Sequence, residues 1–143
     1  MTKTILITGS TDGIGLLTAQ ALAAEGHTIL LHGRNPAKLE AAAKSVGGTT
    51  EQYIADLSKM AEVYPLATAI REKHSQIDVV INNAGILKAP STVTEDGYDI
   101  RFMVNTFAPY ALTVALLPII AKDCPVVNLA SAPQAPVHLH GVL

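Results

Sequence analysis

The fold is decided near the start of the chain, where residues 4–15 read TILITGSTDGIG. The run from Thr4 to Thr8 is short, apolar and β-branched, which predicts a buried strand. Glycines at positions 9, 13 and 15 permit positive φ and the close approach of another backbone. Apolar residues then recur at helical spacing as far as Gly26, which punctuates the end. The segment therefore predicts a strand, a glycine-rich turn and a helix.

Such a turn is a candidate anion site, because the first turn of a helix offers unpaired amides and a positive dipole end to a pyrophosphate. Its Gly-x-x-x-Gly-x-Gly spacing differs from the Gly-x-Gly-x-x-Gly of common dinucleotide folds, and no Lys-Ser or Lys-Thr follows as in a P-loop. The alternative interpretation of this glycine-rich segment is a plain tight turn that binds no anion. The motif is the first strand-to-helix turn of the chain, the place where this class of sheet binds nucleotides.

The alternation of strand and helix continues along the chain. Further strands are predicted at 28–32, 52–55, 78–82 and 126–129, with helices beginning after an N-cap at Asn35, after an N-cap at Ser58, and over 98–121. Apolar strands separated by crossover helices imply a parallel sheet covered on both faces. We predict one domain over residues 1–143, a doubly wound α/β sheet of about five strands with a final strand at an open edge.

The composition of the chain indicates which classes of ligand and which cellular compartment to expect. A net charge of -2 without a cluster of Lys or Arg argues against binding to nucleic acid or to an anionic membrane, and favours small-molecule ligands. The single Cys124 cannot form an intrachain disulfide, and the N-terminus has no readable signal peptide, so we expect a cytoplasmic protein. The apolar stretch 108–121 falls short of the ~20 residues of a membrane span, which predicts a buried helix or a subunit contact.

The second strand ends in a cation where an NAD-selective site would carry an acid. The chain reads His32-Gly33-Arg34-Asn35 at the place where a carboxylate would bind the ribose diol of NAD. The Arg34 guanidinium could bind a 2′-phosphate instead, with Lys38 one helical turn along as a second charge. The alternative is that both are solvated residues at a helix start. We predict NADP as the cofactor, with NAD less favoured.

Five motifs together resemble the short-chain dehydrogenase/reductase family. They are Thr8 to Gly15, Asp56-Leu57 after the third strand, Asn82-Asn83-Ala84-Gly85 after the fourth, Asn105 in the long helix and Ser131 after the fifth strand. The resemblance covers nearly the whole chain. It implies an NAD(P)-binding Rossmann-like domain, incomplete relative to the family, and an oxidoreductase that transfers hydride between nicotinamide and a carbonyl or hydroxyl carbon in a homo-oligomer.

The resemblance also implies roles for single residues. Asp56 and Leu57 would meet the adenine ring, residues 83–85 would lie along a cofactor ribose, and Asn82 would tie the sheet together. Ser131 would polarise the substrate oxygen and Asn105 would hold a water, although a turn residue and a partnered helix residue are the plainer interpretations. The predicted cofactor-binding set is Gly9, Ser10, Thr11, Asp12, Gly13, Ile14, Gly15, Arg34, Asn35, Lys38, Asp56, Leu57, Asn83, Ala84 and Gly85.

The family's general acid/base, a Tyr-x-x-x-Lys beyond the Ser, is not among these 143 residues. None of Tyr53, Tyr64, Tyr98 and Tyr110 has a Lys four positions later. We therefore expect this chain alone to be inactive, because losing such a group typically lowers rates by about 10² to 10⁴. Three possibilities stay open: an oxidoreductase that continues beyond Leu143, an inactive NADP-binding fragment or sensor, and a subunit that borrows the acid/base. His138 and His140 lack metal-ligating partners at suitable spacing, and we predict no metal.

Overall fold

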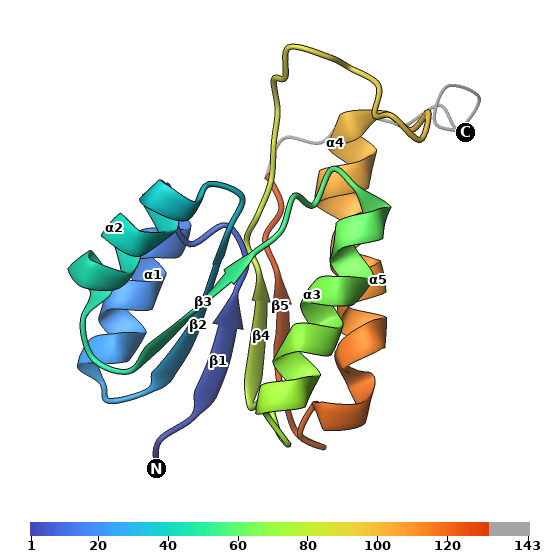
Figure 1. Ribbon diagram of the computed structural model, residues 1–143. Coiled ribbons are helices and arrows are strands. Elements are labelled where there is room, and N and C mark those ends of the chain that lie inside the picture. Colours follow the sequence, from blue (N-terminus) through green and yellow to red (C-terminus); the bar gives the residue numbers. More distant parts are fainter. Residues whose placement is uncertain (132–143) are drawn as a thin grey trace.

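The computed structural model describes residues 1–131, which alternate between strands and helices along the chain (Figure 1). The elements are β1 (Thr4–Ile7), α1 (Gly13–Ala24), β2 (Thr28–Gly33), α2 (Pro36–Val46), β3 (Thr50–Ile54), α3 (Met60–Lys73), β4 (Val79–Asn82), α4 (Ile100–Phe102), a π-helical turn (Met103–Phe107), α5 (Ala108–Leu116), a 3₁₀ turn (Leu117–Ile119) and β5 (Val126–Asn128).

The five strands form one parallel sheet in the order β3-β2-β1-β4-β5. Ile5 of the central β1 pairs with Ile29 of β2 on one side and with Val79 of β4 on the other. The chain runs outward from β1 to β3 and then crosses to β4, so the strand order reverses beside β1. Ligands of doubly wound sheets bind at the carboxyl edge of such a reversal. The predicted fold class is confirmed.

Two helical layers cover the sheet, as Figure 1 shows, with α1 and α2 on one face and α3 and α5 on the other. Side chains alternate along each strand, so β1 sends Ile5 and Ile7 to the α1/α2 face and Leu6 to the opposite face. The α1/α2 face has the smaller apolar cluster: Ile5, Ile7, Ala19, Ala23, Ile29, Leu31 and Leu39. The α3/α5 face has the larger one, which includes Leu6, Leu30, Ile70, Met103, Leu112 and Leu116.

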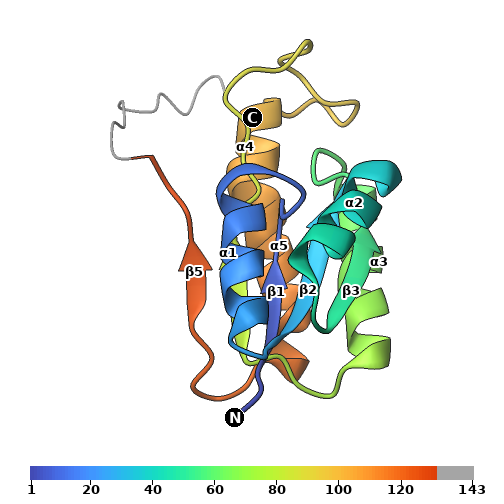
Figure 2. The same cartoon turned by 90° about the vertical axis from the view of Figure 1, so that its left-hand side faces the viewer.

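The last strand lies at an edge of the sheet. Figure 2 shows β5 at the margin of the sheet, without a helix in front of it. Its side chains are exposed, with Val127 at 44%. The predicted open edge is therefore present in the part of the chain that the structure describes.

Residues Ile100–Ile119 form one nearly continuous helical segment with a π-helical turn in its middle. Pro109 has no amide hydrogen, so the carbonyl of Asn105 cannot receive the usual bond from four residues on, which favours the wider turn. The segment is long and apolar enough to span a membrane, whereas the sequence predicted a stretch that was too short. In the fold it packs against α3, and Met103, Leu112 and Leu116 are fully buried.

One predicted helix start is wrong. Ser58 was expected to cap α3, but the helix begins at Met60 with Lys59 at the N-cap position. The Ser58 amide instead donates to Asp56 Oδ1 at 2.9 Å, so the aspartate closes a local turn before the helix. Pro65 lies inside α3.

Candidate functional site

The glycine turn lies against the end of β4. Gly9 and Gly13 have φ of +63° and +53°, a region that side chains disfavour. A Cβ atom on Gly9 would lie 2.8 Å from Ala84 Cα, and one on Gly15 would overlap the Gly9 carbonyl and the Asn83 side-chain amide. The glycines are therefore required by backbone conformation and by close packing at the centre of the sheet edge.

Hydrogen bonds from both sides join the turn to the segment after β4. Thr8 Oγ1 accepts from the amides of Asn83 at 3.1 Å and Ala84 at 3.0 Å. Asn83 Nδ2 in turn donates to the carbonyls of Thr8 at 3.0 Å and Gly9 at 2.9 Å. The ends of β1 and β4 thus hold each other in place, and the predicted segments Thr8 to Gly15 and Asn83 to Gly85 are brought together.

The first turn of α1 has no side-chain cap. Asp12 occupies the N-cap position with extended backbone, but its carboxylate makes no cap hydrogen bond. The carboxylate lies 3.9 Å from Lys38 Nζ in an exposed ion pair. Helix-start amides without a side-chain partner are suited to an anionic ligand.

Ser10 of the turn and His32 of β2 form a buried hydrogen-bonded pair, which the sequence did not predict. Ser10 is fully buried and His32 is 3% exposed. The His32 amide donates to Ser10 Oγ at 2.9 Å, and the imidazole contacts the Gly9 amide and the Ala55 carbonyl. Burial lowers the pKa of His32 from 6.5 to about 4, against smaller opposing effects of Ala55 and Asp56. The Ser10 hydroxyl is hydrogen-bonded to the His32 backbone, and its predicted contact with a cofactor stays a prediction.

The end of β2 presents a cation beside the glycine turn. A Cβ on Gly33 would overlap the side chain of Thr11, so the chain leaves β2 in contact with the turn. The next residue, Arg34, is exposed and has no hydrogen bond or ion pair to the described residues. Asn35 Oδ1 accepts from the Lys38 amide at 3.0 Å and caps α2 as predicted. Arg34 is therefore a cation available to a ligand, whereas Lys38 already faces Asp12.

Beyond β3 the two predicted adenine contacts differ in exposure. The Asp56 amide donates to Glu62 Oε2 at 2.6 Å and its carboxylate accepts from Ser58, so this short loop is fixed against the start of α3. Leu57 is 5% exposed and belongs to the larger apolar cluster, so its side chain serves packing. The adenine contacts stay predictions.

Asn105 holds the segment that follows Gly85. Its Oδ1 accepts from the Ile86 amide and its Nδ2 donates to the Ile86 carbonyl, each at 2.8 Å. The side chain is exposed, and its oxygen and its NH₂ each keep one further hydrogen-bonding position, so the predicted contact with a water stays a prediction. Ser131 is exposed and follows β5 at the carboxyl edge of the sheet, on the same side as the glycine turn.

Asn82 links strands beneath the site. Its Nδ2 donates to Asn128 Oδ1 of β5 at 2.8 Å and to Thr113 Oγ1 of α5 at 3.2 Å. This arrangement matches the predicted role in tying the sheet together. Its buried Oδ1 has no hydrogen-bond partner among the described residues.

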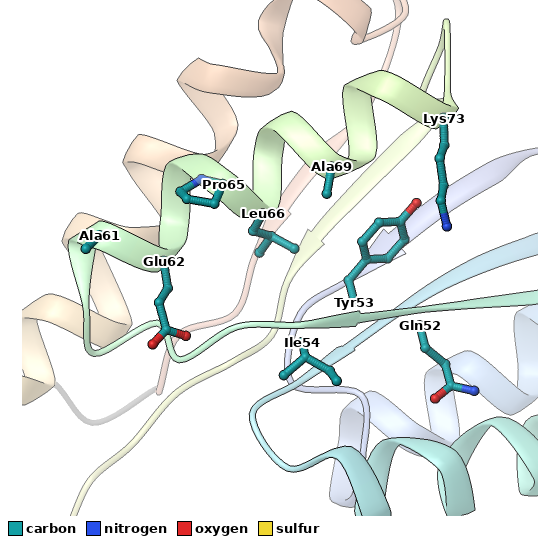
Figure 3. Close-up of a pocket in the computed structure, with 9 residues that line it drawn as sticks. All are labelled: Gln52, Tyr53, Ile54, Ala61, Glu62, Pro65, Leu66, Ala69 and Lys73. Carbon is teal, nitrogen blue, oxygen red and sulfur yellow. The ribbon is translucent and has the colours of Figure 1, made fainter.

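Two hollows flank the sheet. The larger, of about 430 Å³, lies between β3 and α3, lined by residues that include Tyr53, Pro65 and Lys73 (Figure 3). It is away from the glycine turn, and the side chains drawn there do not form a nucleotide cradle. The smaller, of about 300 Å³, is lined by Thr11, Asp12, Lys38 and neighbouring residues of α1 and α2. We place the candidate site at the smaller hollow, because the uncapped helix start adjoins it.

Metal ligands do not gather in the described part of the chain. Residues 1–131 contain no group of three or more His, Cys, Asp or Glu side chains that could hold an ion. His138 and His140 lie outside the described residues.

Comparison with known proteins agrees with this arrangement. The model of the short chain dehydrogenase family matches residues 3–136. Retinol dehydrogenase 13 of Homo sapiens is 35% identical over 96% of this chain and 44% of its own length. A short-chain dehydrogenase from Sphingobium yanoikuyae in complex with NADPH superposes with a TM-score of 0.69 at 32% identity, over 81% of this chain and 48% of its own. A metagenomic short-chain oxidoreductase in complex with NADP has a TM-score of 0.70 at 31% identity, over 81% and 55%.

The chain thus spans about half the length of these solved structures and less than half of that curated relative. The matched region contains the glycine turn, the segment after β4 and the long helix. The protein belongs to the short-chain dehydrogenase family.

Proposed function

We propose that this chain binds NADP in preference to NAD at the glycine turn, as the cofactor-binding part of an oxidoreductase. The observation that carries the proposal is the exposed Arg34 guanidinium, unpaired within the described residues, at the end of β2 beside the uncapped start of α1. A guanidinium matches the geometry and charge of a phosphate. Two similar solved structures, which hold NADPH and NADP, support the same choice of cofactor.

The residues present fit such a cofactor. Glycine at positions 9 and 15 lets the turn pack against the segment after β4, and the start of α1 has no side-chain cap, so its amides would bind a pyrophosphate and Arg34 would bind the 2′-phosphate. Asp56 would lie at the adenine, and Asn83 to Gly85 along a ribose. When bound, the nicotinamide would supply or accept hydride.

The proposal for these 143 residues is cofactor binding. Ser131 would hold a substrate oxygen at the carboxyl edge, and Asn105 would fix the backbone after Gly85 through its two bonds to Ile86. Proton transfer would need the Tyr and Lys of a longer polypeptide or of a partner chain. An NADP-binding sensor without catalysis is the second candidate, because none of the four tyrosines is followed by Lys at the helical spacing.

A titration with NADPH and with NADH, followed by nicotinamide fluorescence, tests the proposal. Losing one charge-assisted contact costs about 1.5–3 kcal/mol, so Arg34→Gln should weaken NADPH binding roughly 10- to 150-fold and leave NADH binding nearly unchanged. Arg71→Gln is the matched control, because Arg71 is an equally exposed arginine on α3, in the opposite layer. Equal affinity of the parent for both cofactors would refute the NADP preference. No binding of either would refute the dinucleotide site.

We also propose that the chain associates with copies of itself. Large apolar side chains are exposed on α5 and β5, notably Tyr110, Val114 and Val127. Exposed apolar surface of this kind favours association. Sedimentation velocity over a range of concentrations tests this, and a monomer throughout would refute it.

A further inference from the structure

We propose that His32 is the positioning residue of the phosphate-binding turn: its neutral imidazole, protonated at Nε2, holds the Gly9 amide in the orientation that dinucleotide binding requires. The inference rests on the proposed cofactor site and adds to it a residue and a proton dependence. His32 itself does not touch the ligand in this proposal, because it is buried beneath the turn.

The two ring contacts define the tautomer. The Gly9 amide donates to His32 Nδ1 at 3.1 Å, and His32 Nε2 lies 3.0 Å from the Ala55 carbonyl oxygen. An amide N–H only donates, so Nδ1 must be unprotonated. A carbonyl only accepts, so Nε2 must carry the proton. Both nitrogens are therefore used, and the two contacts together are compatible with one neutral form of the ring.

Backbone bonds extend this connection to the rest of the turn. The Ser10 amide donates to the His32 carbonyl at 3.0 Å, and the His32 amide donates to Ser10 Oγ at 2.9 Å. His32 thus joins three segments: the turn after β1, the end of β2 that presents Arg34, and the loop after β3 that presents Asp56. Each carries a candidate cofactor contact, so one side chain sets their relative position.

Protonation would break the connection at Gly9. An imidazolium has N–H groups at both nitrogens, so the Nδ1 proton would face the Gly9 N–H, and two donors cannot bond each other. The charged group that acts on the ring is Asp56, whose carboxylate favours the protonated form, while the glycine turn contributes uncharged partners. Burial outweighs Asp56 and holds the pKa at about 4, so the turn is intact at neutral pH. Dinucleotide affinity should therefore be flat near neutrality and fall as the pH approaches 4.

Two substitutions separate the two ring contacts. His32→Asn places a carbonyl oxygen near the position of Nδ1, which keeps the acceptor for Gly9 and removes the titration. His32→Gln reaches the Ala55 carbonyl with its amide nitrogen and leaves no acceptor at Gly9. Losing one neutral hydrogen bond is worth roughly a tenfold change in an equilibrium constant. We expect NADP⁺ to bind His32→Gln roughly tenfold more weakly than the parent, and His32→Asn within about threefold of it.

The pH profile provides the second readout. NADP⁺ affinity is measured by calorimetry from about pH 7.5 to about pH 3.5, and the ratio of parent to His32→Asn at each pH cancels the titration of the ligand's own phosphate. The parent should lose affinity relative to the variant at the acid end. The inference would be overturned if both variants bound NADP⁺ nearly as tightly as the parent. It would also be overturned if both variants lost affinity equally and the ratio of parent to His32→Asn affinity did not change with pH. Failure of the parent itself to bind NADP⁺ would count against the proposed function instead.

NMR tests the positioning role without any ligand. The ¹⁵N shifts of the His32 ring should report a protonated Nε2 and a bare Nδ1, and the Gly9 amide should be protected from exchange and titrate with the ring. A Gly9 amide that exchanges freely at neutral pH, or an Nδ1-protonated ring, would overturn the inference even if the variants failed to fold.

Discussion

Replacing Thr8 by valine should lower the free energy of unfolding by about 1–2 kcal/mol. Thr8 is 2% exposed, and its Oγ1 accepts from the amides of Asn83 and Ala84 at 3.1 and 3.0 Å. Valine keeps the shape of threonine but offers no acceptor. The Ala84 amide would lose its partner, whereas the Asn83 amide also donates to the Ile81 carbonyl at 3.1 Å and would keep that bond. An unsatisfied buried donor costs about 1–3 kcal/mol, and because the Ala84 amide is only partly buried, the lower part of that range applies.

Equilibrium unfolding in urea measures this effect. With a slope of about 2 kcal/mol/M for a domain of this size, the midpoint should fall by about 0.5–1 M while the slope stays constant. Thr8→Ser is the matched control, because it keeps the hydroxyl and removes one methyl group, worth about 1 kcal/mol. If valine unfolds within about 0.5 kcal/mol of the parent, Thr8 does not hold the end of β4 through its hydroxyl, and the reasoning is refuted.

Three further predictions concern the same edge of the sheet. The pKa of His32 is 6.5 in the unfolded chain and about 4 in the folded one, so the unfolded state binds more protons between these two pH values. The contribution of His32 to the free energy of unfolding is therefore complete above pH 6.5 and falls by about 3 kcal/mol as the pH drops to 4. Urea midpoints measured across this range should fall less for His32→Asn than for the parent. Gly15→Ala, whose Cβ would overlap the Gly9 carbonyl, should abolish nicotinamide fluorescence enhancement. Gly97→Ala, whose Cβ would meet nothing within 4 Å and which lies outside the predicted site, should retain it, and the reverse order would contradict the packing described. Asn105→Leu removes two 2.8 Å hydrogen bonds to the segment after β4, so limited proteolysis should cut residues 86–99 faster, and an unchanged rate would show that the segment is held by other contacts.

The fold could be predicted because its signals are local and repeated. Short apolar strands, such as the one ending at Thr8, alternate with helices bounded by glycine and by the Asn35 cap, and each boundary lies close to the observed one. The helix start at Ser58 was wrong because the nearby Asp56 carboxylate captures the Ser58 amide, and two competing turn residues look alike in sequence.

The site could be predicted only in part, because its internal supports come from residues distant along the chain. His32 is a single histidine in an apolar strand, and nothing in its spacing indicates that it meets Gly9 and Ala55. The presence of Pro109 four residues after Asn105 was the available signal for the π-helical turn, since proline withdraws the amide that an α-helix would use there.

The two faces of the sheet are unequally packed, and this has a consequence for local opening. The glycine turn leads into α1, which belongs to the layer with the smaller apolar cluster, and its Leu17 side chain is 66% exposed. Layers that bury less apolar surface open more often by local unfolding. A dinucleotide bound at the turn would stabilise that layer by RT ln(1 + [L]/Kd), so hydrogen exchange there would slow as ligand is added while the α3/α5 layer changed little. The rate at which a protease cleaves α1 and α2 would then fall as the concentration of free cofactor rises.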